Sequence, residues 1–179
     1  MDRSAYHHGH LPDALIAAAT RLLDEPGAAA FSLREVARRV GVSPSAAYRH
    51  YADRDALLGA VAAAGFVSLS AAMRADRGAD PADWFMATGR AYVRHARAHP
   101  ARFALMFGGV RAPAGDAWAV LTEALDGLDL PAQTRPGAEL VAWSAVHGLA
   151  RLLIDGAIPA EGADAAIERV LYGVLRALR

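Results

Sequence analysis

Residues 31–54 read FSLREVARRVGVSPSAAYRHYADR, and this stretch predicts two short helices joined by a tight turn. Ser32 followed by Glu35 has the pattern of a capping box, in which two side chains satisfy backbone donors at the start of a helix. Gly41 is the residue type that takes the left-handed conformation closing a helix. Ser43, with proline directly behind it, then starts the next helix as its cap.

The two predicted helices each have an inward and an outward face. The spacing of apolar residues predicts that the inward residues are Leu33, Val36, Ala37, Val40, Ala47 and Tyr51. The outward residues of the second helix are then Ser45, Ala46, Tyr48, Arg49 and His50. The residues at the start of this outward face have small side chains, and those that follow are basic or aromatic.

This arrangement suits a helix that enters the major groove of DNA. Small leading residues let the backbone approach, and longer donors behind them reach phosphates and base edges. Asp53 is expected to cap the following helix, which makes Arg54 a further phosphate-binding candidate. The alternative is a structural helix pair with an incidental glycine turn, but the caps, the turn and the polar face together favour DNA binding.

The composition restricts the possible kinds of protein. The chain has 179 residues and no cysteine, which excludes a disulfide framework and a thiolate metal site. Its 19 basic residues, all arginine, balance 19 acidic residues. Residues 1–55 are also balanced, with seven of each sign, although residues 32–51 carry four arginines against one glutamate. A nonspecific, charge-driven DNA binder is therefore disfavoured, whereas a sequence-specific one remains consistent with the composition.

No membrane segment or export signal is expected. Charged residues or histidine are expected to interrupt every helix before it reaches membrane length. The first 15 residues, MDRSAYHHGHLPDAL, lack the basic-then-apolar pattern of a signal peptide. We therefore expect a cytoplasmic protein that has no membrane partner.

Proline and glycine divide the chain into helices, with almost nothing that predicts a strand. The fold class is therefore all-α, with about nine helices near residues 12–25, 32–41, 43–51, 53–74, 81–99, 100–107, 114–128, 137–155 and 162–178. The first three form a helix–turn–helix domain over residues 1–55. Residues 56–179 form a helical regulatory and dimerisation domain, and the long helix near 53–74 can connect the two.

The last predicted helix carries a broad apolar stripe, made by Ile167, Val170, Leu171, Val174 and Leu178. A monomer could bury this stripe internally. We favour a homodimer interface, because one short recognition helix contacts little DNA by itself. Two copies related by a twofold axis would read a palindrome, with half-sites about 34 Å or a multiple apart.

Aromatic and soft side chains gather in the second predicted domain. Trp84, Thr88, Tyr92 and His95 share one helix face, and Phe103, Met106, Phe107, Trp118, Trp143 and His147 add to them. Aromatic and methionine walls with a few polar groups describe a small-molecule cavity. They equally describe an ordinary core, and the sequence leaves both interpretations open.

Two histidine patterns could indicate metal sites. His95 and His99 have the spacing of a metal-binding pair, but the sequence places no third ligand. The tract Tyr6-His7-His8-Gly9-His10 is better explained as a flexible arm near DNA, because it precedes the first helix of the binding unit. We expect neither a metal nor a cofactor.

Along essentially its whole length, the chain resembles the TetR family of transcriptional regulators. The most specific part is SLREVARRVGVSPSAAYRHYADRDALL. The pieces YHHGHL, HPARFALMF and AWSAVHG resemble the subfamily named for a Trp-His-Gly motif, here Trp143, His147 and Gly148. The chain departs from the pattern at Tyr51, where Phe is common, and at Arg54, where Lys is common.

The resemblance implies an all-helical dimer, usually a repressor that a small molecule releases from operator DNA. It also implies that the last two helices form a four-helix dimer interface. By position, Tyr48 and His50 would contact phosphates, and Ser45, Ala46 and Arg49 would lie nearest the bases. Arg34 would flank them, with Ser43 and Arg54 also at the DNA.

Two other function classes are alternatives to a DNA-binding regulator. A small all-α enzyme would need a base or nucleophile, and the candidates are His147, His95, Glu139 and Asp155. No phosphate loop, nucleophile elbow or metal triad accompanies them. A helical adaptor that binds protein through its last helix would leave the outward face of residues 45–50 without a purpose.

Overall fold

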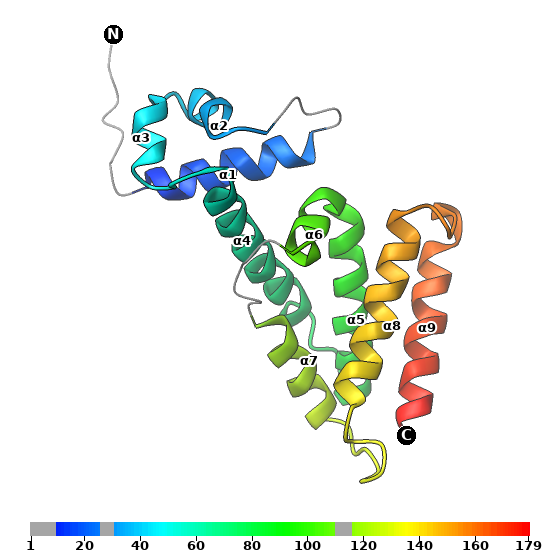
Figure 1. Cartoon of the computed structure of the whole chain (residues 1–179). Coiled ribbons are helices and arrows are strands. Elements are labelled where there is room, and N and C mark those ends of the chain that lie inside the picture. The colour runs from blue at the N-terminus through cyan, green and yellow to red at the C-terminus, as the bar shows by residue number, and fades with distance from the viewer. Residues whose placement is uncertain (1–9, 26–30, 110–115) are drawn as a thin grey trace. The chain divides into compact units, whose positions relative to one another are not determined.

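The computed structural model describes residues 10–25, 31–109 and 116–179. Within these residues every regular element is helical, as predicted (Figure 1). The elements are α1 (Leu11–Asp24), α2 (Leu33–Val40), α3 (Pro44–Tyr48), α4 (Arg54–Arg74), α5 (Pro81–Ala98), α6 (Pro100–Phe107), α7 (Ala117–Asp126), α8 (Ala138–Ile154), the 3₁₀ helix η1 (Ala160–Gly162) and α9 (Ala163–Leu178). The prediction of an all-α chain with about nine helices is confirmed.

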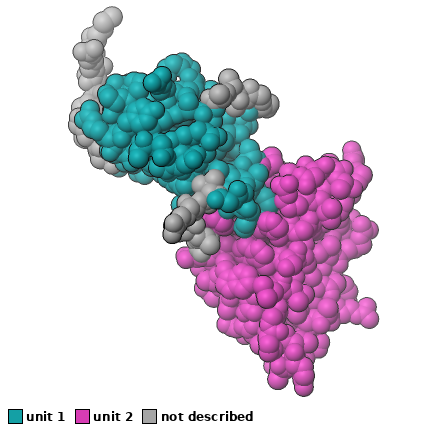
Figure 2. All heavy atoms as spheres, viewed as in Figure 1, with its two compact units in different colours: residues 1–65, 101–112 teal, residues 66–100, 113–179 magenta. Residues whose placement is uncertain are grey.

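The chain divides into two compact units, which Figure 2 colours separately. Unit 1 comprises residues 1–65 and 101–112, and unit 2 comprises residues 66–100 and 113–179. The boundaries of these units are set by the packing of the helices, and packing does not show which residues bind DNA and which regulate it. The predicted domains, residues 1–55 and 56–179, therefore stay a prediction.

Unit 1 has an apolar core built by its first helices and the start of α4. Leu15 and Leu22 of α1, Val36 of α2 and Ala47 of α3 are almost completely buried, and Leu57 of α4 joins them. The inward positions predicted for the two short helices therefore lie in this core. Burial of these apolar side chains is the main free-energy gain that holds the short helices in place.

The helix α6 packs within unit 1, although it follows α5 in the sequence. The Nη2 group of Arg102 donates to Asp24 of α1 at 2.7 Å, and Leu105 packs against the core of α1 to α4. The absence of a side chain at Gly65 admits Met106, because an added Cβ would lie 2.7 Å from its sulfur. These contacts attach α6 to the helix–turn–helix unit.

Unit 2 is a bundle in which α5 packs against α7, α8 and α9 (Figure 1). Its core contains Phe85 of α5, Leu121 and Leu125 of α7, and Leu175 of α9. At Gly89 the helices α5 and α9 approach closely, because a Cβ there would lie 2.2 Å from Cδ2 of Leu171. This bundle fixes which faces of α5 and α8 point inward.

The apolar stripe of α9 is buried inside a single chain. Ile167, Leu171, Val174 and Leu178 are between 1% and 8% exposed, and Val170 packs partly buried against the same core. The spacing therefore identified a buried face correctly, but the assignment of these five side chains to a contact between two copies is corrected. The helices α5, α7 and α8 of the same chain already cover them.

One described helix, α4, is long and apolar enough to cross a membrane by length and composition. The expectation that charged residues or histidine interrupt every helix is wrong for α4, since residues 56–73 carry none. Half of its apolar window is buried within the protein, as in the core helix of a folded domain. Burial of Leu57, Val61, Leu69 and Met73 gives this apolar composition a structural role.

Candidate functional site

The turn between α2 and α3 has the geometry that its residue types predicted. Ser32 Oγ accepts a hydrogen bond from the Glu35 N–H at 3.2 Å, so the serine half of the capping box is present. Gly41 takes a φ of +79°, and its N–H and that of Val42 donate to the carbonyls of Arg38 and Ala37. This paired pattern is a Schellman motif, which ends α2 and turns the chain sharply.

The short helix α3 is fixed at its start by a cap, and so is the helix that follows it. Ser43 Oγ accepts from the Ala46 N–H at 3.2 Å, with Pro44 as the first helical residue. Beyond α3, Asp53 Oδ1 accepts from the Ala56 N–H at 2.8 Å and caps α4. The predicted caps at Ser43 and Asp53 are confirmed. They position a helix of five residues that is too short to be stable alone.

The outward face of α3 and the following turn is exposed as predicted. Ser45, Arg49 and His50 are exposed, Tyr48 is 46% exposed, and Ala46 is half-buried at the edge of the unit 1 core. The side chains that would reach a duplex therefore extend from a rigidly held backbone. Their contacts with phosphates and bases stay predictions.

Ion pairs neutralise part of the positive charge on α2. Glu35 accepts hydrogen bonds from both Arg38 and Arg39, and Arg39 also pairs with Glu25, the residue that follows α1. Arg34 and Arg49 make no ion pair within the described part of the chain. Residues 32–51 therefore carry less unpaired positive charge than their four arginines and one glutamate alone suggest.

Arg54 lies at the start of α4, where two interactions already hold it. Its Nη1 is 3.3 Å from an oxygen of Asp55, and its guanidinium carbon is 5.8 Å from the centre of the Phe31 ring. The ion pair with Asp55 is exposed, so a phosphate could replace it, whereas the Phe31 ring is half-buried. The chain spacing that predicted Arg54 as a phosphate contact did not reveal either interaction.

Unit 2 brings together four of the predicted cavity residues. The hydroxyl of Tyr92 on α5 and Nδ1 of His147 on α8 form a hydrogen bond of 2.9 Å. The Tyr92 ring meets Trp143 edge-on at 5.2 Å between centroids, and Trp143 meets Trp118 of α7 at 5.6 Å. Burial raises the pKa of the Tyr92 hydroxyl well above its ordinary value. Burial, and then Arg151, lower the pKa of His147.

The other predicted cavity residues have different surroundings. Phe103, Met106 and Phe107 lie on α6 in unit 1, where the two phenyl rings are 4.8 Å apart. Trp84 and Thr88 lie on α5 in unit 2, as His95 does. The ten residues therefore come from both units, and the spacing along the sequence could not separate them.

Comparison with known proteins identifies both parts of the chain. Residues 15–61 match the family model described as "Bacterial regulatory proteins, tetR family", and residues 85–174 match "Tetracyclin repressor-like, C-terminal domain". The chain belongs to the TetR family. It is thus a transcription regulator with a helix–turn–helix DNA-binding domain rather than an enzyme.

Solved structures of similar proteins cover nearly the whole chain. A protein of unknown function from Rhodococcus sp. RHA1 is 34% identical, with 98% of each chain covered and a TM-score of 0.81. A transcriptional regulator from the same strain is 25% identical, covering 94% of this chain and 95% of that one, with a TM-score of 0.67. A TetR variant from Acinetobacter baumannii AYE, in complex with minocycline, shares the fold at 20% identity, 92% and 96% coverage and a TM-score of 0.67. No curated protein matches this chain.

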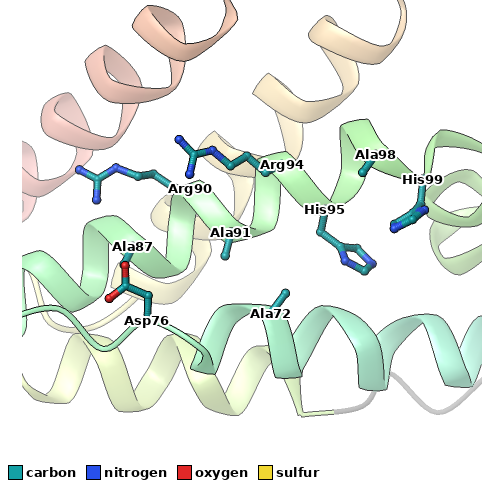
Figure 3. Close-up of a pocket in the computed structure, with 9 residues that line it drawn as sticks. All are labelled: Ala72, Asp76, Ala87, Arg90, Ala91, Arg94, His95, Ala98 and His99. Atoms are coloured by element: carbon teal, nitrogen blue, oxygen red, sulfur yellow. The ribbon is translucent and has the colours of Figure 1, made fainter.

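A groove of about 380 Å³ runs between the end of α4 and α5 in unit 2 of this TetR-family chain (Figure 3). Of the predicted cavity residues, only His95 lines it. The other lining residues were not predicted from the sequence, and they are Ala72, Asp76, Ala87, Arg90, Ala91, Arg94, Ala98 and His99. Four of these are alanines, which a pattern of aromatic side chains in the sequence does not indicate.

His95 of α5 and His99, which caps the end of that helix, both line this groove. The rings of His95 and His99 are 5.1 Å apart between centroids. Among the described residues, no group of three or more histidine, cysteine, aspartate or glutamate side chains could hold a metal ion. The arm Tyr6-His7-His8-Gly9-His10 lies outside the described residues, apart from His10.

The ion pairs of Glu35 predict a pH dependence of unit 1 stability. Hydrogen bonds from Arg38, and then from Arg39, lower the pKa of Glu35 from 4.5 to about 2. This carboxylate therefore contributes stability above pH 4.5, and the contribution is lost as the pH falls toward 2. We expect Glu35→Gln to flatten the decline in thermal midpoint over this pH range, measured by circular dichroism.

The control for this titration is Glu161→Gln, because Glu161 is exposed and makes no ion pair within the described residues. That variant should follow the wild-type profile. A Glu35→Gln protein with an unchanged pH profile would contradict the assigned role of the pairs. The effect is expected to be modest, since these groups are solvent-exposed.

Proposed function

We propose that this protein is a ligand-responsive repressor that binds a palindromic operator as a homodimer and is released by a small molecule. The observation that carries the proposal is the exposed polar face of α3 on a capped, well-packed helix–turn–helix unit. A second helical unit is available for regulation. A family of repressors with this architecture supports the same conclusion.

The proposed DNA contacts follow the exposed face. Tyr48 and His50 bind phosphates, and Arg49 donates to base edges in the major groove. Around them, the smaller or peripheral contacts are Ser43, Ser45, Ala46, Arg34 and Arg54. The zero net charge makes contact geometry, rather than long-range attraction, the source of specificity.

Selection of bound duplexes from a random pool tests this function. The full-length protein is incubated with the pool at moderate salt, and the bound duplexes are sequenced over several rounds. We expect a palindromic consensus whose half-site centres are about one or two helical turns apart. Recovery of sequences with no shared motif would contradict the proposal.

We propose that two copies pair through the outward faces of α8 and α9. The buried stripe of α9 leaves large apolar side chains exposed there: Leu140, Val141 and Leu152 on α8, and Tyr172 on α9, which is 64% exposed. Gly148 and Gly173 have no neighbouring atoms that an added Cβ would meet. Such positions let helices of a second copy approach closely, and the exposed side chains can be buried between them.

Introduction of a charge at Tyr172 should disrupt this dimer. Tyr172→Glu is expected to shift the protein to a monomer at micromolar concentration, because an unpaired carboxylate would be buried at the interface. Analytical ultracentrifugation measures the change. The matched control is Val67→Glu, which adds the same charge at an exposed apolar position of α4. A Tyr172→Glu protein that remains as dimeric as the control would refute the proposed surface.

We propose that a small molecule bound in unit 2 weakens operator binding. The TetR structure with minocycline supports this kind of regulation, and α4 gives a continuous path because its residues belong to both units. An effector can act only through different affinities for the DNA-bound and free conformations.

Such coupling must be reciprocal. Once an effector is identified, saturating operator should lower its affinity by the same factor by which saturating effector lowers operator affinity. For typical coupling this factor is about 5 to 150. Isothermal titration calorimetry with each ligand in turn measures both. If saturation with either ligand left the affinity for the other unchanged, an allosteric response would be excluded.

The finer classification is also a proposal. We place the chain in the subfamily with the Trp-His-Gly motif, formed here by Trp143, His147 and Gly148. The hydrogen bond of His147 to Tyr92, and the contact of Trp143 with the same ring, give the first two residues a shared structural role. A bacterial transcription regulator acts on DNA in the cytoplasm, so we place the protein there.

A further inference from the structure

A network of ion pairs in unit 1 joins four charged side chains: Glu25, Glu35, Arg38 and Arg39. The carboxylate of Glu35 accepts two hydrogen bonds from Arg38, both of 2.8 Å, and one of 2.9 Å from Arg39. Glu25, which follows α1, accepts from Nη2 of Arg39 at 2.8 Å. Glu35 therefore holds two guanidinium groups at once.

The two arginines of this network differ in how they are held. The side chain of Arg39 is 29% exposed and has two carboxylate partners, Glu25 and Glu35. The side chain of Arg38 is 72% exposed, and its one carboxylate partner within the described residues is Glu35. Loss of the Glu35 charge would therefore release Arg38, whereas Arg39 would keep Glu25.

Arg38 lies on the side of α2 that carries Arg34. The two residues are four apart in this helix, and side chains at that spacing share one face. Arg34 flanks the base contacts of α3 in the proposed complex, so a released Arg38 would extend on the same side toward the DNA backbone. A guanidinium there binds phosphates of any sequence, because phosphate contacts carry no base information.

We propose that Glu35 limits the sequence-independent affinity of this protein for DNA, because it holds Arg38 away from backbone phosphates. With Arg38 paired, the affinity depends mainly on the contacts that α3 makes. Weak sequence-independent binding agrees with the zero net charge of the chain. The inference rests on the proposed function, since it places DNA against α2 and α3.

The substitution Glu35→Gln tests this proposal on duplex DNA of random sequence. Glutamine can replace glutamate in a capping box, so α2 should keep its start, and circular dichroism checks the fold. The full-length variant should bind the duplex about fivefold more tightly than wild type, since an exposed ion pair no longer has to be broken. Fluorescence anisotropy at several salt concentrations measures the affinity. A plot of log affinity against log salt should be steeper by about 0.9 for each bound protomer, the value for one additional phosphate contact.

The matched control is Glu25→Gln, which removes the same charge from the same network. Glu25 is exposed, and after its loss Glu35 still holds both arginines. This variant should keep the wild-type salt slope. If Glu25→Gln steepened the slope as much as Glu35→Gln, the effect would come from net charge, and the proposal would be wrong. An unchanged slope in a folded Glu35→Gln protein would also overturn it.

Substitution of Arg38 identifies the released side chain. In the Glu35→Gln background, Arg38→Gln should restore the wild-type slope, because no other arginine is released. In the wild-type background, Arg38→Gln should leave the slope unchanged, since the paired Arg38 makes no phosphate contact. This single variant keeps the test independent of how well Glu35→Gln folds. A shallower slope for it, or a steep slope that persists in the double variant, would contradict the role of Arg38.

Operator selection is a separate measurement, so the two proposals can fail independently. If an operator is selected and Glu35→Gln binds random duplex as wild type does, the inference about Glu35 is wrong and the repressor function stands. If Glu35→Gln behaves as described and no operator is selected, the restraint on Arg38 is real but the repressor function is wrong.

Discussion

Replacement of Arg49 by alanine is expected to weaken binding to the selected operator by about tenfold to a hundredfold. Arg49 is exposed just beyond α3 and makes no ion pair within the described residues, so its guanidinium is available to a base edge. One good two-point contact between arginine and guanine is worth about 1–3 kcal/mol of discrimination. Fluorescence anisotropy with labelled duplexes at fixed salt measures the loss.

The pattern across sequences distinguishes base recognition from phosphate binding. Arg49→Ala should bind single-base operator variants nearly as well as the consensus at the position that Arg49 reads. Tyr48→Phe and His50→Ala should instead weaken binding to all duplexes by similar factors. Arg97→Ala, on α5, is the control for loss of one positive charge. Unchanged affinity in the Tyr48, Arg49 and His50 variants would refute the assignment of α3 and the turn after it to DNA.

Replacement of Gly89 by valine is expected to destabilise unit 2 by about 3 kcal/mol, at the upper end of overpacking costs. The added Cβ would lie 2.2 Å from Cδ2 of Leu171, a side chain that is 1% exposed and surrounded by core. The crossing of α5 and α9 must therefore widen, or Leu171 must take a strained rotamer. Urea unfolding at fixed protein concentration measures the change in the free energy of unfolding.

A double substitution tests the cause. Leu171→Ala alone should destabilise the protein by about 2–5 kcal/mol, because it leaves a cavity. In the Gly89→Val background it should cost much less, since the valine fills part of that space. Ala119→Val places the same new residue at an exposed site of α7 and should cost under about 1 kcal/mol. Strict additivity of the two core substitutions would contradict the predicted clash.

The local features of the helix–turn–helix could be predicted because single residues determine them. A serine hydroxyl at Ser32 or Ser43 caps the nearest free N–H groups, and glycine at Gly41 takes the left-handed conformation at little cost. The inward-facing positions of α2 and α3 could likewise be predicted, because helical periodicity relates residues that are close in the sequence. All these interactions join residues within one or two turns of each other.

Features that depend on distant residues were harder to predict. Periodicity showed that Leu171 and Val174 are buried, but it could not show whether the same chain or a second copy covers them. The attachment of α6 to unit 1 depends on Arg102 meeting Asp24, which is 78 residues away. The groove between α4 and α5 likewise depends on alanines that carry no chemical signal of their own.

The difference between two dissociation constants tests the central claim most directly. The full-length protein is titrated into the selected palindromic duplex and into a scrambled duplex of equal length and composition, at moderate salt. If α3 reads base sequence in each half of a dimer, the palindrome should bind at least about a thousandfold more tightly, as is typical of specific DNA-binding proteins. Equal affinities for the two duplexes would contradict the account.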